Sequence, residues 1–377
     1  MHNIDLVNSD KSIRFTADGI EMSPLAYSQL LYKLTKSRNI ERDVYSLGGI
    51  IREFEAKFAD LLGKETAVMM PSGTLSNQIA IRELANNKGR ALVQKESHIY
   101  NDSGDCLQTL SRLNLIPLAP DRATFTLDDV KQVIDKAKTG KVATEVGVIS
   151  IESPVRRKYN ELFNFEEMKK ISTFAKARGI RLHLDGARLF IASTFSGISP
   201  KEYASLFDTV YVSLFKYFNA GFGAILACSN EFAKDLHHVR RMFGGNIFQM
   251  WPSAVIALNF LDTFMDELRM AIDLADDFFD LIQKNPSFKV EKIPNGSNVF
   301  KLHILSDVDL DTFRDTLEKK NVYLPEPEAD SNTFLLRINV TLNRISADRL
   351  AEIFIESLQA LRVKTIDTAP KIPVLTR

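Results

Sequence analysis

The chain has 377 residues, of which 45% are hydrophobic and 25% are charged, a composition typical of a globular protein with room for a large core and a second, smaller domain. Lysine plus arginine equals aspartate plus glutamate at 48 each, so no net charge attracts nucleic acid or an anionic membrane surface. We therefore expect neither partner.

Cysteine usage and the chain start bear on the compartment. Cys106 and Cys228 are too few for a disulfide framework or a cysteine-based zinc site, and we expect no metal. Residues 1–10 lack the basic start and long apolar stretch of a secretory signal, and the apolar runs are shorter than the ~20 residues of a membrane helix. We expect a cytoplasmic protein.

Residues 1–50 read as a mixed, helix-rich arm that packs outside the sheet. Residues 50–63 then show helical periodicity closed by Gly63. Within the arm, Tyr45 lies in a loop near the pair Gly48-Gly49. Such a tyrosine is usually a packed loop residue, and a role at a binding site is the alternative.

Residues 66–70 form an apolar strand that turns into a helix through Ser72, Gly73 and Thr74. Free backbone N–H groups and two hydroxyls at the positive end of a helix are a common way to hold a phosphate. The alternative is a helix N-cap alone, since serine and threonine cap helices without any ligand. The spacing and the lysine of a nucleotide P-loop are missing.

The next strand, 91–94, is followed by His98. At the carboxyl end of a strand in an α/β sheet, an imidazole could stack on a flat ring of a ligand. A satisfied structural histidine is the alternative. Further on, 114–118 reads as a strand and 127–138 as a surface helix.

The strand 146–152 ends in Glu152, and Arg156, Arg157 and Lys158 follow in a loop. Three adjacent cations usually mark a solvated loop. Pointing inward, they would favour an anionic substrate.

Two short apolar runs that each end at one ionisable residue are the centre of the sequence. Residues 180–185 end at Asp185, and residues 209–215 end at Lys216. An open α/β sheet binds its ligand at the carboxyl ends of its strands, so this acid and this amine can meet one small molecule. The pair suits pyridoxal phosphate: the lysine would form a Schiff base with the aldehyde, and the aspartate would keep the pyridine nitrogen protonated.

The alternation of strand and helix from 66 to 216 predicts an α/β fold with a mostly parallel sheet flanked by helices. A strand over 222–229 runs back, a helix covers 230–242, and a long helical stretch follows over 252–279. We expect the following organisation: an arm at 1–50, a large domain at 51–252, a linking helix at 253–284, a small α+β domain at 285–362, and a tail at 363–377.

Arg337 interrupts an otherwise apolar strand at 333–340. A guanidinium fork suits a substrate carboxylate. The alternative is an edge-strand arginine that faces water.

These motifs together resemble the threonine aldolase family of fold-type-I pyridoxal-phosphate enzymes over nearly the whole chain. The resemblance rests on Pro71-Ser72-Gly73-Thr74-Leu75-Ser76-Asn77-Gln78, Ser97-His98-Ile99-Tyr100, His183-Leu184-Asp185-Gly186-Ala187-Arg188-Leu189-Phe190, and Lys216 with Gly223. It implies retro-aldol cleavage of a β-hydroxy-α-amino acid, and a homodimer or homotetramer whose sites are completed by a neighbouring subunit.

The resemblance also implies residue roles. Lys216 corresponds to the Schiff-base lysine, Asp185 to the pyridine-nitrogen partner and His98 to the stacked imidazole, and these three are the candidate catalytic residues. The candidate cofactor-binding residues are these three with Ser72, Gly73, Thr74, Arg188 and Arg240. Candidate substrate-binding residues are Ser9, Tyr45, Arg188 and Arg337, and Tyr45 and Arg240 are also candidates for contacts across subunits.

Departures from the family pattern fall near the substrate. Where the family usually has Glu-Asn-Thr-His-Asn, this chain has Glu152-Ser153-Pro154-Val155-Arg156, so Val155 replaces a histidine. Phe215 replaces the serine before the lysine. The alternatives are therefore β-elimination, transaldol transfer or transamination of another, possibly acidic, amino acid, or a protein that binds the cofactor without turnover.

Overall fold

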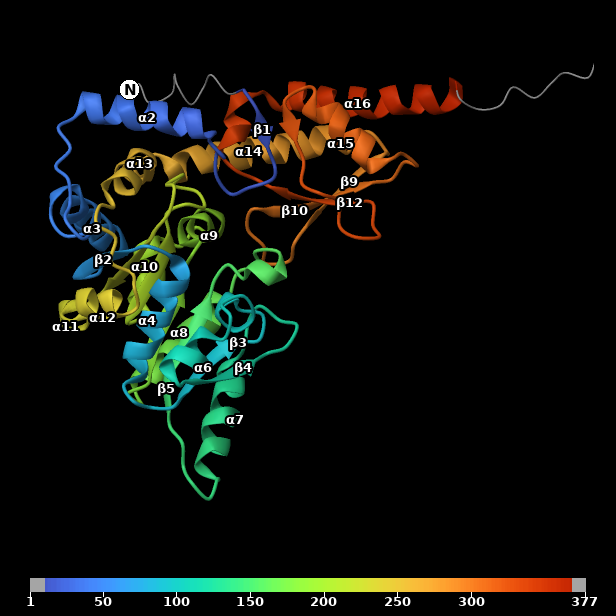
Figure 1. Ribbon diagram of the computed structural model, residues 1–377. Helices are drawn as coiled ribbons and strands as arrows, with labels where there is room; N and C mark the ends of the chain where they lie inside the picture. Colours follow the sequence, from blue (N-terminus) through green and yellow to red (C-terminus); the bar gives the residue numbers. More distant parts are fainter. Residues whose placement is uncertain (1–10, 368–377) are drawn as a thin grey trace, which may run out of the picture. The chain divides into compact units, whose positions relative to one another are not determined.

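The computed structural model describes residues 11–367, with side chains described through Leu361. By contact density the chain divides into two compact units. The first unit contains 21–265 and 293–298, and the second contains 11–20, 266–292 and 299–367. Figure 1 shows the elements of both units in sequence colours.

A seven-stranded sheet forms the centre of the first unit (Figure 1). Its order is β2-β8-β7-β6-β5-β3-β4. The only strand that runs against the others is β8, which pairs antiparallel with β2 on one side and β7 on the other. The strands are β2 (Thr66–Met70), β3 (Arg90–Gln94), β4 (Asn114–Leu118), β5 (Val146–Glu152), β6 (Arg181–Asp185), β7 (Thr209–Ser213) and β8 (Ala224–Cys228).

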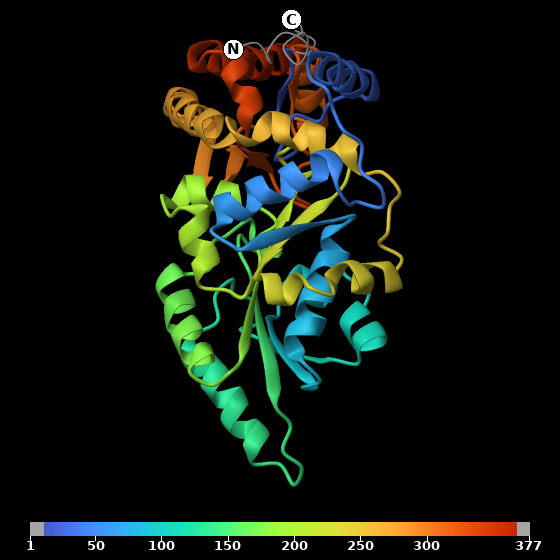
Figure 2. The ribbon, with the colours of Figure 1, turned by 90° about the vertical axis from the view of Figure 1, so that its left-hand side faces the viewer.

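These strands match the predicted ones, and the predicted α/β architecture is confirmed. All residues of β5, β7 and β8 are buried, as expected for a sheet covered on both faces. Figure 2 shows the sheet between two helical layers, with α4 and α6 on one side and α7 and α8 on the other. The helices of this unit that lie before β6 are α2 (Pro24–Ser37), α3 (Gly49–Leu62), α4 (Gly73–Ala85), α5 (His98–Asn101), α6 (Cys106–Ser111), α7 (Leu127–Lys138) and α8 (Phe165–Lys176).

After β6 come α9 (Leu189–Ser196), α10 (Pro200–Ser205), α11 (Asn230–Ala233), α12 (Leu236–Met242) and α13 (Trp251–Leu261). Two helix starts carry capping boxes that fix the chain direction. Thr126 and Asp129 form one at α7, and Ser199 and Glu202 form the other at α10.

The second unit contains a three-stranded antiparallel sheet of order β12-β10-β9 and a parallel pair β1-β11. Its core is aromatic, with the rings of Phe15, Phe278, Phe288, Phe313 and Phe354 in mutual contact. The elements are β1 (Ile13–Arg14), α14 (Phe264–Ile282), β9 (Phe288–Lys292), β10 (Val299–Ile304), α15 (Leu310–Glu318), β11 (Val322–Tyr323), β12 (Thr333–Arg337) and α16 (Ala347–Asp367).

The structure differs from the sequence-based elements in several places. The helices predicted over 230–242 and 252–279 are each two helices, broken at Lys234-Asp235 and at Asp262-Thr263. No glycine or proline marks either break, so periodicity alone runs through them. Residues 11–20 contribute β1 to the second unit, and α16 continues to Asp367, into the segment predicted as a tail.

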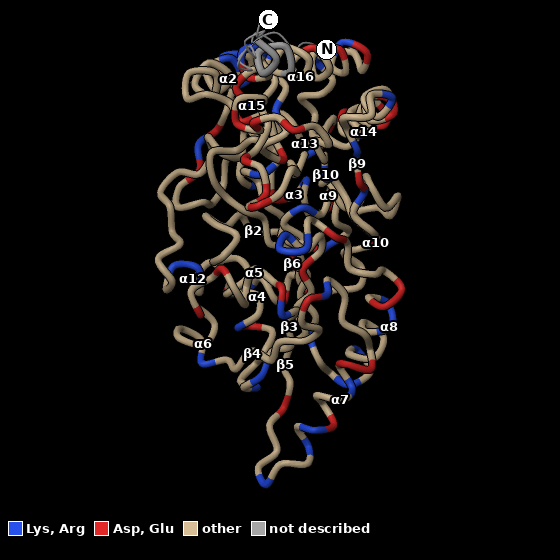
Figure 3. Tube along the Cα trace, turned by 90° about the vertical axis from the view of Figure 1, so that its right-hand side faces the viewer, with Lys and Arg blue, Asp and Glu red and all other residues tan. Residues whose placement is uncertain are grey.

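Charge is distributed evenly along the chain. Figure 3 shows lysine and arginine interspersed with aspartate and glutamate in both units, in keeping with the formal net charge of zero. Among the residues that the structure describes, no helix has the length and apolar character to cross a membrane.

Candidate active site

Sheet topology brings the candidate residues of the first unit to one edge. The strands β2, β3, β5, β6 and β7 point in one direction, so their carboxyl ends meet at this edge. Glu152 and Asp185 are register partners on β5 and β6, and Asp185 is in turn the partner of Tyr211 on β7. His98 and Lys216 follow β3 and β7 within four residues.

The turn after β2 is a helix start held by a serine. The Oγ of Ser72 accepts the N–H of Leu75 at 3.2 Å, which makes Ser72 the N-cap of α4. The first N–H groups of a helix have no partner inside it, and here they belong to Gly73 and Thr74. The capping function and a phosphate cradle are compatible at this turn.

Gly73 is required by its neighbour on β7. A Cβ at Gly73 would lie 2.0 Å from the hydroxyl of Tyr211, which is 97% buried. Burial raises the pKa of that hydroxyl, so Tyr211 stays neutral. The backbone of the turn therefore approaches the sheet as only glycine allows.

Asp185 is 4% exposed and has two hydrogen-bond donors. Its Oδ2 accepts from Nδ2 of Asn77 at 2.6 Å, and its Oδ1 accepts the N–H of Ala187 at 3.2 Å. These two bonds hold the buried carboxylate in one orientation.

Lys216 lies in the tight connection between β7 and β8. The N–H of Leu214 donates to the carbonyl of Gly223, and the N–H of Ala220 donates to the carbonyl of Leu214, both at 3.1 Å. Tyr217 and Phe218, which immediately follow the lysine, are fully buried and pack on each other with ring centroids 4.5 Å apart. These aromatic side chains anchor the loop and leave Lys216 half-buried at the strand ends.

His98 begins the short helix α5, and Glu152 fixes that start. Oε2 of Glu152 accepts the N–H of His98 at 2.5 Å, and Oε1 accepts the N–H of Arg156 at 2.9 Å. Burial, together with the neighbouring charge of Asp185, raises the pKa of Glu152 to about 7. Burial lowers the pKa of His98, so its imidazole is neutral at neutral pH.

Two of the three adjacent cations bind an acid beside His98. Arg156 donates to Oδ2 of Asp102 at 2.5 Å, and Arg157 donates to Oδ1 at 2.9 Å. Nδ1 of His98 lies 3.8 Å from the same carboxylate. The loop is therefore tied to the rim of the strand ends, with one more positive charge than negative in the group Arg156, Arg157 and Asp102.

Arg188, a candidate for both cofactor and substrate, is 93% buried and directly precedes α9, three residues after Asp185. Arg240, a candidate for a contact across subunits, is 99% buried within its own chain. It donates to the carbonyl of Met69 at 2.5 Å and to that of Tyr45 at 3.2 Å, and its Nε has no partner among the described residues. As a side chain of the chain interior, Arg240 supports the end of β2.

Tyr45 is exposed by 45% and adopts a left-handed backbone conformation with φ 55°. Its N–H donates to the carbonyl of Phe248, and the two rings meet edge to face at 5.2 Å. Below them, the buried carboxylate of Asp43 accepts the N–H groups of Met250 and Trp251, which caps α13. Tyr45 thus lies on a loop held by these hydrogen bonds, with its side chain partly exposed.

The remaining substrate candidates lie elsewhere in the chain. Arg337 ends β12, an edge strand of the second unit, where its side chain is half-buried and donates to the carbonyl of Thr16 at 3.4 Å. Ser9 lies outside the described residues.

The residues present fit pyridoxal phosphate by their chemistry. The N-terminus of α4 offers N–H groups to a phosphate, Lys216 offers an amine to an aldehyde, and Asp185 offers an oriented carboxylate to a ring nitrogen. The close approach of Gly73 leaves no room for a Cβ in the cradle. Sequence reasoning missed Asn77 and Tyr211; Asn77 follows Gly73 by one helical turn, the spacing that could have indicated it.

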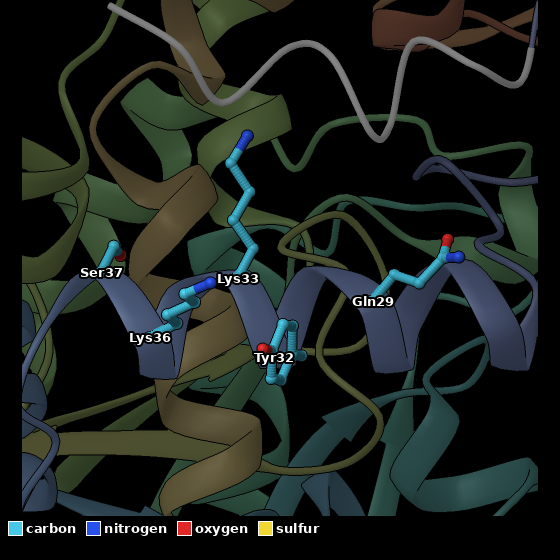
Figure 4. Close-up of a pocket in the computed structure, with 5 residues that line it drawn as sticks. All are labelled: Gln29, Tyr32, Lys33, Lys36 and Ser37. Carbon is cyan, nitrogen blue, oxygen red and sulfur yellow. The ribbon is translucent and has the colours of Figure 1, made fainter.

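A surface hollow of about 640 Å³ lies away from these strand ends. Figure 4 shows that its lining residues come from one helix, α2: Gln29, Tyr32, Lys33, Lys36 and Ser37. A shallow hollow on a single helix lacks the convergent polar groups of a binding site.

Comparison with known proteins gives the family. Residues 36–296 match the family model described as beta-eliminating lyase. The low-specificity L-threonine aldolase of Candida albicans is 32% identical over 260 residues, which is 68% of each chain. That of Saccharomyces cerevisiae is 33% identical over 208 residues, 54% of this chain and 52% of the relative.

A solved structure agrees with these sequences. The crystal structure of a putative L-allo-threonine aldolase from Listeria monocytogenes matches with a TM-score of 0.77 and 28% identity, covering 94% of this chain and 98% of that one. The fold is that of the fold-type-I pyridoxal-phosphate enzymes, as expected. The chain belongs to the beta-eliminating lyase family, in which the threonine aldolases are its relatives.

Proposed function

We propose that this protein is a pyridoxal-phosphate-dependent lyase that cleaves a β-hydroxy-α-amino acid of the threonine or allo-threonine type to glycine and an aldehyde. The observation that carries the proposal is the convergence of Lys216 and Asp185 at neighbouring strand ends, beside the glycine turn that begins α4. The family match over 36–296 supports the same chemistry.

In the reaction the Cα–Cβ bond breaks, its electron pair stays on Cα, and the proton of the β-hydroxyl leaves as the aldehyde forms. Pyridoxal phosphate supplies the electron sink for that pair when bound. Asp185 contributes by holding a negative charge where a protonated ring nitrogen needs it. Lys216 would hold the cofactor through its amine and would then be placed to return a proton to Cα.

A group that accepts the hydroxyl proton has to come from the remaining residues. Val155 is fully buried and apolar, so the position where family members carry a histidine offers no base. Because burial lowers the pKa of His98, its ring is neutral and able to accept a proton at neutral pH. We propose the neutral imidazole of His98 as that group, with Arg188 toward the substrate carboxylate.

The test is an aldehyde assay of the purified protein loaded with pyridoxal phosphate. L-Threonine and L-allo-threonine are followed by coupling acetaldehyde to alcohol dehydrogenase, and phenylserine by benzaldehyde absorbance. We expect aldehyde from at least one substrate and none from a Lys216→Ala variant. Absence of aldehyde from all three would refute the proposal.

The arginine pair favours one variation on this function. Arg156 and Arg157 share one carboxylate next to His98, which leaves a positive charge for an acidic substrate side chain. A β-hydroxy amino acid with a carboxylate on its β-carbon would then be preferred. The comparison is kcat/KM for β-hydroxyaspartate and for threonine: Arg156→Ala is expected to lower the first at least 10-fold more than the second, and equal losses would exclude the arginine from substrate selection.

We further propose a homo-oligomer in the cytoplasm. Exposed apolar side chains gather on the two loops joined by the Tyr45–Phe248 contact, including Val44, Leu47 and Phe248 at 49–55% exposure. Clustered exposed apolar side chains are typical of an interface.

Both cysteines are free and buried, in keeping with a reducing compartment.

A further inference from the structure

A chain of four buried side chains runs from β7 through β6 to the helix α4. Thr209 and His183 are register partners on neighbouring strands, and Nδ1 of His183 lies 2.8 Å from the hydroxyl of Thr209. Nε2 of His183 lies 2.9 Å from Oδ1 of Asn77, whose Nδ2 donates to Asp185 at 2.6 Å. Thr209, His183 and Asn77 are fully buried.

The geometry has a simple origin. Residues two apart on a strand point to the same face of the sheet, so His183 and Asp185 both face α4. A single amide from the helix spans them and contacts both.

The direction of each hydrogen bond in this chain is determined by the neighbouring group, starting from Asp185. An ionised carboxylate can only accept, so the amide nitrogen of Asn77 has to face Asp185 and its oxygen has to face His183. Nε2 of His183 must then carry the proton, since an amide oxygen cannot donate. Burial lowers the pKa of His183 to about 4, so the ring is neutral, and its bare Nδ1 accepts the Thr209 hydroxyl.

The opposite direction is available only to a protonated Asp185. The acid would donate to the Asn77 oxygen, the amide would donate to Nε2, and Nδ1–H would donate to Thr209. That state requires an amide flip, a change of tautomer and a rotated hydroxyl together. The hydrogen-bond directions therefore link the protonation state of Asp185 to the tautomer of His183, with Asn77 between the two.

We infer that Asn77, His183 and Thr209 form a directional hydrogen-bond relay that orients the Asp185 carboxylate toward a cofactor ring nitrogen. The inference rests on the proposed function for the identity of that partner. Asn77, His183 and Thr209 are positioning residues, since none of them has to touch the cofactor.

The first experiment needs no cofactor. The protein, labelled with ¹⁵N-histidine and kept free of pyridoxal phosphate, is examined by long-range ¹H–¹⁵N correlation from pH 5.5 to 8, and His183 is assigned by difference with a His183→Phe variant. We expect the Nε2–H tautomer of a neutral ring throughout this range. An Nδ1–H tautomer, or a ring that becomes charged within it, would overturn the relay.

The second experiment measures the effect on Asp185 through cofactor affinity. Asn77→Leu has similar volume and removes both hydrogen bonds, whereas Ser76→Ala removes the neighbouring buried hydroxyl, which has no partner among the described residues. A lost hydrogen bond to a charged group predicts about 10- to 100-fold weaker binding of pyridoxal phosphate for Asn77→Leu. Ser76→Ala is expected within about twofold of the wild type, because it leaves every bond of the relay in place.

The outcomes separate the inference from the proposed function. In a folded Asn77→Leu, judged by its melting temperature, a mixed His183 tautomer with weakened cofactor binding supports the relay. Unchanged tautomer and affinity, or equal losses in Ser76→Ala, would overturn it. If the wild type binds no pyridoxal phosphate, the proposed function fails, while the His183 tautomer still decides the direction of the relay.

Discussion

The substitution Gly73→Ala tests whether the turn after β2 depends on close packing against the sheet. The added Cβ would lie 2.0 Å from the hydroxyl of Tyr211, whereas ordinary contact begins at 3.4 Å, so the two must separate by about 1.4 Å. Tyr211 is 3% exposed and lies on β7 between β6 and β8, so a shift of its ring would press on the packed side chains around it. The start of α4 therefore has to move away from the sheet.

Gly73→Ala is expected to lower both the stability of the fold and the catalytic efficiency. Overpacking of this kind lowers the free energy of unfolding by about 1–3 kcal/mol. A displacement of about 1 Å in a group that positions the reactants lowers kcat/KM by roughly 10²-fold, and the cradle N–H groups of Gly73 and Thr74 move with the helix start.

Chemical denaturation measures the first effect, and the aldehyde assay together with pyridoxal-phosphate titration measures the second. Gly89→Ala is the matched control, since a Cβ there has nothing within 4 Å. Adding Tyr211→Leu to Gly73→Ala makes room, so the double variant should be more stable than the sum of the single effects predicts, by about 1 kcal/mol or more. If Gly73→Ala has the same free energy of unfolding and the same cofactor affinity as Gly89→Ala, the packing argument is wrong.

Three further predictions concern other buried or exposed groups. Burial raises the pKa of Glu152 from 4.5 to about 7, so this carboxyl stabilises the folded chain below pH 4.5 and the advantage disappears between pH 4.5 and 7. Urea unfolding should show Glu152→Gln gaining on the order of 3 kcal/mol relative to the wild type across that window, and parallel pH profiles would contradict the raised pKa. Burial raises the pKa of Glu55 to about 7, and the neighbouring charge of Arg240 opposes that rise. Arg240→Met should destabilise the fold by about 3 kcal/mol, because Glu55 loses this positive neighbour and the carbonyls of Met69 and Tyr45 lose their donor. Glu55→Gln should recover part of the loss in denaturation curves, and strict additivity would refute the coupling. Leu47→Glu should lower the particle mass measured by light scattering, and an unchanged mass would place the subunit interface elsewhere.

The strand ends could be predicted because their signal is local. Asp185 and Lys216 each follow an apolar run directly, so one-dimensional spacing was enough to find them. The glycine turn at Gly73 carried a similar local pattern.

Buried polar groups on helices could not be found in this way. Asn77 bonds to partners more than 100 residues away, and its spacing from Gly73 places it on the same helix face without identifying those partners. Arg240 is a second example: the resemblance implies a role at the site, and only the structure shows that it bonds to the carbonyls of Met69 and Tyr45. Such pairings depend on tertiary contacts that periodicity does not record.

The position of β8 between β2 and β7 determines when the site can assemble during synthesis. The strand that leads into the glycine turn pairs only with β8, and even the nearest partners, Met70 and Ala224, are 154 positions apart. Strands β3 to β7 can pair with one another as the ribosome delivers them, but β2 must wait for a segment made much later. Long-range pairing of this kind slows folding. A nascent chain that stops before Ala224 would therefore have its lysine strand beside its aspartate strand and still lack an ordered place for the phosphate.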